Sequence, residues 1–397
     1  MDIVKLKDLT VDGKGTYGVA APAVEYQENL PTYLRITDIL DDGTLNLSEL
    51  KSVKVSDSER YMLRPNDIVF ARTGGSTGRN YFYDGTDGEF VYAGFLIKFS
   101  LDPKKVNPKF IKYFCQSEQY KQWVQSFNTG STRGNINAQT FGNMEIALPG
   151  RKQQDHLVSV LESIGKKIKL NKKINDNLQQ QAQALFKSWF LNYEPWDGTA
   201  PNSWLHGKLG DYANIKRGGS PRPIQEYLSN SGLRWLKISD VTGLQTPFII
   251  DIKDHIIEEG LKKTVFLKAG SLVLSNSATP GIPKILDVDS CIHDGWLYFP
   301  ESRFSNEYLY LYFKYIRQQL VNLSNGSVFN NLKTDILKGY PTILPDEGTL
   351  QRFDEIIKPM FLQMQNLTRE SHDLMDLRDT ILPRLMSGEL DVSGIQL

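Results

Sequence analysis

Two long stretches of this 397-residue chain carry apolar residues at alternating spacings of three and four positions. One runs from Leu157 to Trp189 and the other from Phe353 to Leu385, and all ten positions correspond at an offset of 196 residues (353 − 157). Such a pattern predicts two long helices that pair along one stripe, as in a coiled coil. The alternative is that each helix packs only on its own domain. The residues of the predicted seam are Leu157, Leu161, Ile164, Ile168, Asn171, Asn175, Leu178, Ala182, Leu185 and Trp189, and Phe353, Ile357, Met360, Met364, Leu367, Ser371, Leu374, Arg378, Ile381 and Leu385.

Polar residues interrupt both stripes, at Asn171 and Asn175 in the first and at Ser371 and Arg378 in the second. Buried polar residues at seam positions can fix the register and the choice of partner helix. Between Gln153 and Phe190 the chain carries six Lys and three acidic residues, whereas between Gln351 and Met386 it carries five basic and six acidic residues. We therefore expect the two helices to pair with each other rather than with copies of themselves.

The segment before each long helix has a different pattern, with short apolar runs bounded by Gly, Pro, Asn and Asp. The runs 67–71 and 271–275 predict buried strands, and each segment also contains a helical stretch, 108–123 in the first and 306–320 in the second. Several short motifs recur at the offset of 196, including Leu148-Pro149 and Leu344-Pro345. A repeat of this length indicates a duplicated domain rather than a solenoid unit.

These patterns predict an α+β protein. Two pseudo-twofold-related domains are joined by two long antiparallel coiled-coil helices. The expected boundaries are 1–150 for the first domain, 151–194 for the central helix, 195–346 for the second domain, and 347–397 for the C-terminal helix and tail.

Composition excludes several function classes. Lys+Arg and Asp+Glu both number 46, so binding to nucleic acid would have to depend on local basic patches. Only two cysteines are present, which excludes a disulfide framework and a cysteine metal site and favours a reducing compartment. The chain has no apolar run of about 18 residues and does not open like a signal peptide, so we expect a cytoplasmic protein.

Catalytic motifs are lacking in the sequence. The Gly-rich segment 72–80 resembles a phosphate loop but lacks the Gly-Lys-Ser/Thr ending. Asn107-Pro108-Lys109-Phe110 faintly resembles the Asn-Pro-Pro-Tyr/Phe signature of amino-methyltransferases, but Lys109 replaces the second proline. A helix N-cap at Asn107 and at Asn306 explains both copies better. The five His residues show no metal-ligand spacing, so we expect neither a metal nor a catalytic residue.

The polar loops remain as candidate contact surfaces. Arg is well suited to guanine edges and Asn to adenine edges, and loops at corresponding places in the two repeats carry different polar residues. For each loop alone, an ordinary surface turn is the competing interpretation. We expect Arg72, Arg79 and Arg133 to serve one half of a DNA target and Asn276, Lys284 and Asn330 the other. The full set of candidate DNA-binding residues is Arg72, Thr73, Ser76, Thr77, Arg79, Asn80, Arg133, Asn135, Arg217, Arg222, Asn276, Ser277, Thr279, Lys284, Asn330 and Asn331.

Taken together, the chain resembles the specificity (S) subunit of Type I restriction-modification systems. The most specific features are the Leu-Pro-x-x-x-x-Gln lead-in to the helices, the helix ending 178–190, and the segment from Lys216-Arg217-Gly218-Gly219 to Trp235-Leu236-Lys237. The second copy departs from the lead-in, because its Gln351 stands one residue later. This resemblance implies a non-catalytic, sequence-specific DNA-binding subunit that recognises a bipartite target and serves in phage defence.

The resemblance also implies partners. They are double-stranded DNA, two methyltransferase (M) subunits and, in the full complex, two restriction (R) subunits. That complex is an adenine-DNA methyltransferase and ATP-dependent endonuclease, so S-adenosylmethionine, ATP and Mg are expected in the partner subunits and no cofactor in this chain.

Two other functions stay open from the sequence. One is an enzyme that modifies DNA unaided, which would need Asn107 or an acidic cluster to be catalytic. The other is a scaffold that spaces two proteins without binding DNA.

Overall fold

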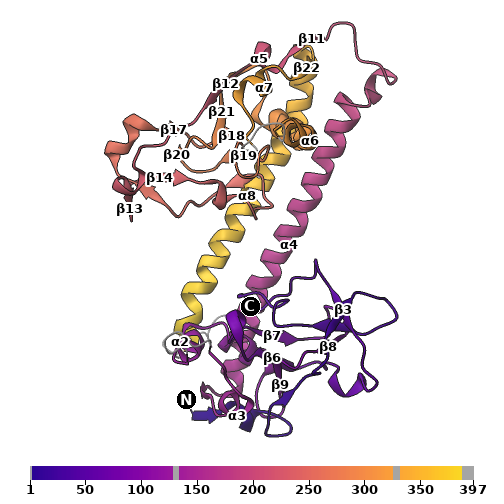
Figure 1. The fold of residues 1–397 in the computed structure, drawn as a ribbon, viewed down its shortest axis with the longest axis vertical. Coiled ribbons are helices and arrows are strands. Elements are labelled where there is room, and N and C mark those ends of the chain that lie inside the picture. The colour runs from indigo at the N-terminus through magenta and orange to yellow at the C-terminus, as the bar shows by residue number, and fades with distance from the viewer. Residues whose placement is uncertain (1, 128–133, 325–330, 387–397) are drawn as a thin grey trace. The chain divides into compact units, whose positions relative to one another are not determined.

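The computed structural model describes residues 2–127, 134–324 and 331–386, except for the side chains of 324, 385 and 386. Contacts divide the chain into two compact units, residues 1–166 with 375–397, and residues 167–374. Helices and sheets are mixed in both units, which confirms the α+β class (Figure 1). Both units contain part of each long helix, α4 (Arg151–Phe190) and α8 (Glu347–Met386). The units thus divide within the helices, whereas the sequence suggested boundaries at the helix ends.

The first unit is built on two four-stranded sheets. One has the strand order β2-β9-β6-β7 and the other β3-β5-β4-β8, in which only β4 and β8 are parallel. A separate strand pair, β1 with β10, closes the domain next to α4. The strands are β1 Asp2–Lys5, β2 Thr16–Tyr17, β3 Ala23–Glu25, β4 Thr32–Leu34, β5 Lys51–Val53, β6 Asp67–Ala71, β7 Asn80–Tyr83, β8 Phe90–Tyr92, β9 Leu96–Ser100 and β10 Glu145–Leu148. The helices are η1 Leu6–Leu9, η2 Glu59–Tyr61, η3 Gly74–Ser76, α1 Pro108–Phe114, α2 Glu118–Gln125 and α3 Ala138–Gly142.

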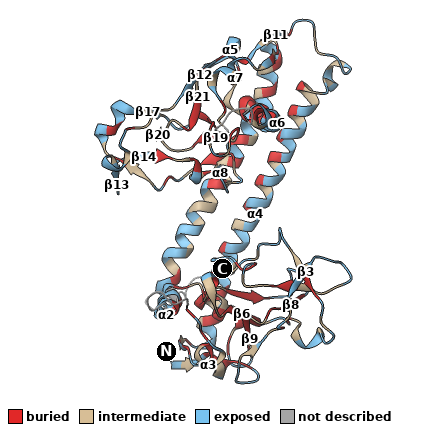
Figure 2. Cartoon of the chain, viewed as in Figure 1, coloured by how far each residue is buried: buried red, intermediate tan, exposed pale blue. Residues whose placement is uncertain are grey.

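The predicted strand 67–71 is β6, an inner strand of the first sheet, and all five of its residues are buried (Figure 2). One face packs against the helices, where Phe70 stacks on Phe141 with ring centroids 4.7 Å apart. Val69 and Ala71 point to the other face and join the core beneath the second sheet. A strand buried on both faces explains why this run reads as continuously apolar rather than alternating.

The second unit repeats this plan with additions. Its main sheet has the order β12-β21-β18-β19-β15, and its second sheet the order β13-β16-β14-β20-β17. The predicted strand 271–275 is β18, which occupies the position that β6 has in the first unit. The strands are β11 Leu205–Lys208, β12 Ala213–Arg217, β13 Leu228–Ser229, β14 Leu233–Leu236, β15 Phe248–Ile249, β16 His255–Ile256, β17 Val265–Leu267, β18 Leu272–Ser275, β19 Pro283–Leu286, β20 Ser290–Ile292, β21 Trp296–Ser302 and β22 Pro341–Leu344. The helices are η4 Glu194–Trp196, α5 Leu209–Tyr212, η5 Ile224–Glu226, η6 Ile238–Asp240, η7 Glu258–Lys263, α6 Asn306–Ser324 and α7 Thr334–Lys338.

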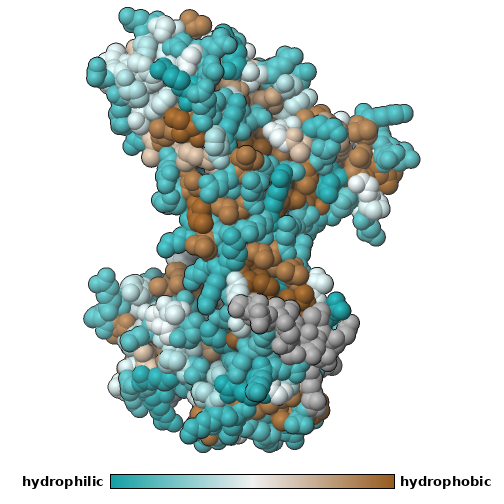
Figure 3. Space-filling view, turned by 180° about the vertical axis from the view of Figure 1, so that it is seen from behind, coloured by the Kyte–Doolittle hydropathy of each residue, from teal (hydrophilic) through white to brown (hydrophobic). Residues whose placement is uncertain are grey.

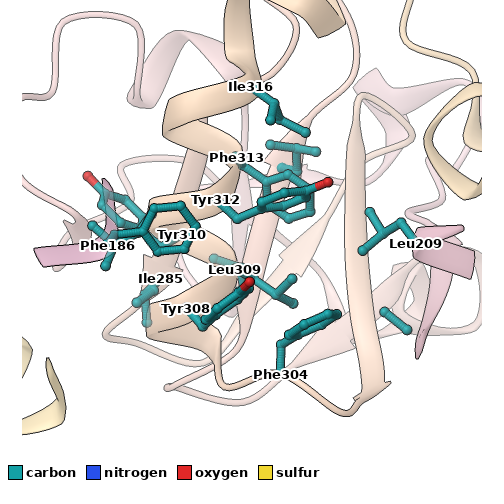
Figure 4. Close-up of a cluster of buried hydrophobic side chains, with 14 of the residues drawn as sticks. Phe186, Leu209, Ile285, Phe304, Tyr308, Leu309, Tyr310, Tyr312, Phe313 and Ile316 are labelled. Carbon is teal, nitrogen blue, oxygen red and sulfur yellow. The ribbon is translucent and has the colours of Figure 1, made fainter. Parts of the chain in front are cut away.

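The core of the second unit is centred on α6, whose Tyr308, Tyr310, Tyr312 and Phe313 are buried, whereas Tyr315 is 50% exposed. Figure 4 shows Tyr308, Tyr312 and Phe313 of this helix together with Phe186 of α4. Phe190 continues the cluster, with its ring 4.9 Å from Tyr308 and 4.7 Å from Phe353. Because this contact joins α4, α6 and α8, the C-terminal half of α4 is part of the domain core.

The two long helices are antiparallel within the second unit. Asn171 Nδ2 donates to Glu370 Oε2 at 2.8 Å, and Asn175 Nδ2 donates to Thr368 Oγ1 at 3.2 Å. These direct contacts exclude the alternative that each helix packs only on its own domain. Every predicted seam residue with a described side chain is buried or half-buried. The buried stripe is wider than predicted, because Gln179, Phe186, Phe190, Phe361 and Thr368 are also buried.

Two local predictions are wrong. The stretch 108–123 is not one helix but two, because Ser117 caps a new helix by accepting a hydrogen bond from Tyr120 N. The helix α6 is capped not by Asn306 but by Ser305, whose Oγ accepts from Tyr308 N at 3.2 Å. In the first copy Asn107 is the N-cap as expected, and it accepts from Lys109 N at 3.0 Å. None of the described helices combines the length and apolar composition that a membrane span requires.

Candidate nucleic-acid interface

The Gly-rich loop of the first unit connects β6 to β7. It turns through η3 with Gly74 and Gly78 in the left-handed region, at φ of 76° and 86°. A Cβ atom at Gly78 would lie only 2.4 Å from the Val124 side chain, so this glycine is also required by close packing. The loop is therefore a defined turn held against α2 and not a free phosphate cradle.

Arg72 occupies the first position of this loop, directly after β6. Its guanidinium carbon lies 5.1 Å from the centroid of the Tyr17 ring, and its Nη2 donates to Asn135 Oδ1 at 3.4 Å. The Nε atom is buried without a hydrogen-bond partner. The backbone N of Arg72 donates to Phe95 O at 3.0 Å, and the Phe95 side chain is 60% exposed. Four segments distant in the sequence thus meet at one arginine.

Thr73, Ser76 and Thr77 brace this loop. Thr73 forms a backbone bridge with Asn135, and Thr77 Oγ1 donates to Gly74 O at 2.8 Å and to Gly134 O at 3.0 Å. Ser76 is buried, whereas Asn135 is exposed. Of these predicted contact residues, only Asn135 presents its side chain openly beside Arg72.

Arg79 and Asn80 also have structural partners. Arg79 Nε donates to Asp41 Oδ1 at 2.7 Å, and its Nη1 donates to Ile39 O at 3.1 Å. Asn80 is buried, and its Nδ2 donates to Cys115 O at 3.0 Å. In this conformation both side chains hold the loop to the domain, which does not fit the expected role in base readout.

The corresponding loop of the second unit follows β18 and begins at Asn276. This residue is buried, and its Nδ2 donates to Asp294 O at 3.3 Å while its Oδ1 has no partner. Thr279 Oγ1 is likewise buried without a partner, and Ser277 is half-buried. These groups lie close to the hairpin that carries Asp294.

Lys284 is the clearest departure from the predicted site. It is buried in β19, where its Nζ donates to Leu244 O at 2.7 Å and also to Thr246 O. Burial lowers the pKa of Lys284 to about 7, and the charge of Lys314 adds to the effect. An amine with both acceptors inside the fold serves the structure, so Lys284 does not fit the expected role in DNA contact.

Arg217 and Arg222 converge on Asp294. Arg217 Nε donates to Asp294 O at 2.5 Å, and Nη2 atoms of Arg217 and Arg222 lie 3.7 and 3.3 Å from Asp294 Oδ2. Ser220 Oγ donates to Asp294 Oδ1 at 2.6 Å. Burial acts to raise the pKa of Asp294, but the Ser220 hydrogen bond and the two arginine charges outweigh it and lower the pKa. The carboxylate is therefore charged and orients two half-exposed or exposed guanidinium groups.

The two loops lie in the same backbone frame. In the first unit the hydrogen bonds are Gly18 N to Leu96 O, Val19 N to Tyr92 O, Leu96 N to Ala93 O, Arg72 N to Phe95 O and Ile136 N to Arg72 O. In the second unit the matching bonds are Gly218 N to Trp296 O, Gly219 N to Ile292 O, Trp296 N to His293 O, Asn276 N to Gly295 O and Leu332 N to Asn276 O. We call these bonds, the residues they join and the residues next to those in the sequence the recognition frame.

Glycine stands at the same point of each recognition frame for the same reason. A Cβ atom at Gly18 would lie 2.1 Å from Tyr92 O, and one at Gly218 would lie 2.2 Å from His293 O. The residues just before them, Tyr17 and Arg217, therefore occupy equivalent places, as do Arg72 and Asn276. The frame is shared between the units, but its side chains are different.

Two predicted residues, Arg133 and Asn330, lie outside the described residues. Of the predicted residues that follow them, Asn135 is exposed and Asn331 is half-buried. Among the described residues, no group of three or more His, Cys, Asp or Glu could hold a metal ion.

Comparison with known proteins identifies the family. A sequence model described as the Type I restriction modification DNA specificity domain matches residues 3–180 and 201–369, once for each repeat. The chain belongs to this family.

Two curated members of this specificity family show how far the similarity extends. The Type I restriction enzyme MjaIX specificity subunit of Methanocaldococcus jannaschii is 23% identical over 72% of this chain and 70% of that protein. The HindI specificity subunit of Haemophilus influenzae is 20% identical over 90% of this chain and 94% of that protein. A crystal structure of a Type I restriction-modification system S subunit from M. genitalium has a TM-score of 0.60 at 16% identity and covers 97% of this chain and 95% of that one. This structural likeness supports the fold.

Sequence reasoning missed three residues of this family member's recognition frame. They are Tyr17 and Phe95 in the first unit and Asp294 in the second. A signal was present for one of them, because Tyr17-Gly18 and Arg217-Gly218 correspond at an offset of 200 (217 − 17). The role of Phe95 depends on a hairpin that meets the loop only in the folded chain.

Proposed function

We propose that this chain is a non-catalytic specificity subunit that recognises a bipartite DNA target and directs methyltransferase and restriction subunits to it. Membership of the DNA specificity family supports the first part of this proposal. Division into two half-sites depends on one observation, the recognition frame that recurs in both units with different polar side chains. A single scaffold with two sets of side chains is suited to two half-sites of different sequence.

The methyltransferase partners are proposed to bind the long helices. Apolar side chains remain exposed along them, including Leu170 on α4 and Ile356, Leu362 and Leu377 on α8. On the side of the molecule seen in Figure 3, apolar residues likewise interrupt a mainly hydrophilic surface. Because α4 and α8 are repeats of one another, they offer two similar surfaces, which supports two M subunits per chain.

The chemistry is proposed to belong to the partners. S-adenosylmethionine would serve the M subunits, and ATP and Mg the two R subunits, while this chain supplies recognition. Its net charge of zero supports this division, since a chain that enclosed DNA unaided would need a basic surface.

A methylation experiment tests the proposal. The chain is co-expressed with its M subunits in a host without other methyltransferases, and modified adenines are mapped by single-molecule sequencing. We expect one motif of two short sequences separated by an unread spacer. Methylation without a sequence motif, or a single undivided motif, would contradict the proposal.

A second assay addresses the enzyme alternative. Purified chain without M subunits is incubated with S-adenosylmethionine and target DNA, and the matched sample contains the full complex. We expect methyl transfer only in the full complex. Transfer by the chain alone would show that it is an enzyme.

A further inference from the structure

We propose that Arg72 in the first unit and Arg217 in the second unit each read a guanine, so that one arginine of each recognition frame specifies one base pair of one half-site. This inference depends on the proposed function, since it assigns the base-reading residues of that same surface. It also changes the assignment made from the sequence, because the positively charged residue that contacts a base in the second unit is Arg217 and not Lys284.

Arg72 has the geometry of a pre-positioned reader. Its guanidinium lies against the Tyr17 ring, and that ring is held in place because Tyr17 OH accepts from Ala138 N at 3.1 Å. Stacking on a fixed ring defines the plane of the guanidinium and reduces the entropy lost when it binds a ligand. Asn135 Oδ1 accepts one hydrogen bond from Arg72 Nη2, at 3.4 Å.

The donors of Arg72 have no anionic partner. Among the described residues no carboxylate forms an ion pair with it, and its Nε is buried without a hydrogen bond. Arg79 in the same loop differs, because Asp41 and Ile39 O bind its guanidinium and only 29% of its side chain is exposed, against 52% for Arg217. The buried Nε cannot reach a base, so the contact would be made by the two terminal nitrogens, whose planar fork matches the two acceptors on the major-groove edge of guanine.

Arg217 takes the place of Tyr17 in the second recognition frame. Its Nε donates to Asp294 O, and Asp294 Oδ2 lies 3.7 Å from its Nη2. These two contacts fix the orientation of the guanidinium group. The side chain is 52% exposed. Asn276 fills the place of Arg72 but is buried. Each frame thus presents one oriented arginine, from the end of β6 in the first unit and from the end of β12 in the second.

Arg222 is the other cation near Asp294, and it is set apart by its position. It is 77% exposed and lies outside the backbone hydrogen bonds that the two units share. An exposed cation of this kind suits a phosphate contact, which adds affinity without sequence preference.

The test uses the complex with M subunits and a library of plasmids that carry all variants of the target. Arg72→Ala and Arg217→Ala are compared with Arg72→Lys and Arg217→Lys, which keep the charge but lose the fork. Arg60→Ala is the matched control in the first unit, because Arg60 also stacks on a tyrosine, with 5.6 Å to the Tyr61 centroid. Lys268→Ala is the control in the second unit, because Lys268 forms an ion pair with Asp289.

We expect Arg72→Ala to lose roughly 5- to 150-fold of the discrimination at one G·C pair of one half-site, the range for a bidentate base contact. Arg217→Ala should do the same in the other half-site only. The Lys variants should not restore discrimination, and the controls should methylate the wild-type motif. Melting of each purified variant shows whether the fold is intact, and the Lys variant replaces any Ala variant that does not fold.

Several outcomes would overturn the inference. A uniform loss of affinity that the Lys variant rescues would mean a phosphate contact, and a half-site without a G·C pair would leave the arginine nothing to read. An unchanged motif in both variants would also refute it while leaving the proposed function intact. A wild-type complex without any motif would instead refute the proposed function.

Discussion

At the scale of single residues, the polar side chains of the two loops fall into two groups. Arg79, Asn80 and Lys284 have their polar groups bound inside the domain. Arg72 instead has no carboxylate partner among the described residues, and Arg217 is bound to Asp294 but keeps 52% of its side chain exposed. Residue type does not distinguish the groups, because each contains an arginine. The distinction follows from the partner that each side chain finds in the fold, and partners decide whether a donor is free to bind a ligand.

The burial of Lys284 predicts a dependence of stability on pH. Its pKa of about 7 in the folded state is below its value in the unfolded chain, so between these values the unfolded chain binds more protons. Stability from this residue should therefore rise with pH from about 7 upward. Relative to Lys284→Met, the wild-type protein should gain about 2 kcal/mol between pH 7 and pH 9.

Chemical unfolding of both proteins across this range measures the difference. Taking the difference removes the contribution of other titrating groups. A constant difference between pH 7 and pH 9 would show that Lys284 stays charged in the fold.

At the scale of elements, the antiparallel helices combine an apolar stripe with polar contacts. Asn171 and Asn175 bind Glu370 and Thr368 through their Nδ2 atoms, but the Oδ1 atom of each is buried without a partner. An unsatisfied buried acceptor costs free energy, so these residues reduce stability while they specify the pairing.

Replacing Asn171 with leucine should therefore stabilise the folded chain, by about 1 kcal/mol. Glu370 is not left without a partner, because Lys167 Nζ lies 3.2 Å from it and it is half-exposed. Unfolding in denaturant measures the change. Asn177→Leu is the control, since Asn177 is exposed on the same helix, and it should change stability by less than about 0.5 kcal/mol. A loss of stability in Asn171→Leu would mean that its hydrogen bonds outweigh the unsatisfied oxygen.

At the scale of the whole molecule, α4 and α8 each contribute residues to both units, and we expect their length to set the spacing of the proposed half-sites. We predict that inserting seven residues into both helices, at paired positions, lengthens the accepted spacer. Seven residues add about 10 Å at ~1.5 Å per residue, or roughly three base pairs. Insertion into both helices preserves their antiparallel register, and the methylation motif of the variant complex gives the spacer length. An unchanged spacer length in the variant would show that the length of the helices does not set the spacing of the half-sites.

Assembly with M subunits should change DNA affinity. A chain of zero net charge has little capacity to neutralise phosphates, so we expect the isolated chain to bind its target weakly. The complex should bind more tightly by more than about tenfold, or ~1.4 kcal/mol, at one fixed salt concentration. Fluorescence anisotropy measures affinity, and native mass spectrometry should find two M subunits per chain. A single M subunit, or equal affinity in both states, would contradict this prediction.

The sequence by itself determined the elements of this protein and their repetition. The spacing of apolar residues from Leu157 to Trp189 predicted α4, and runs such as 67–71 predicted the buried strands. These features are local, because a helix or a buried strand shows its period in consecutive residues. The duplication was equally visible, since equal offsets between motifs need no knowledge of the fold.

Only the tertiary structure decided which side chains form the candidate site. Arg79 is bound by Asp41, a residue 38 positions away, and is therefore not free to contact DNA. The guanidinium of Arg72 is positioned by the Tyr17 ring, which is also distant in the sequence. The wider stripe on α4 also depends on the tertiary structure, because Phe186 and Phe190 are buried by α6 and α8. Burial and hydrogen bonding depend on segments that are distant in the chain. A pattern of consecutive residues does not show which distant segments come into contact, so it cannot predict these partners.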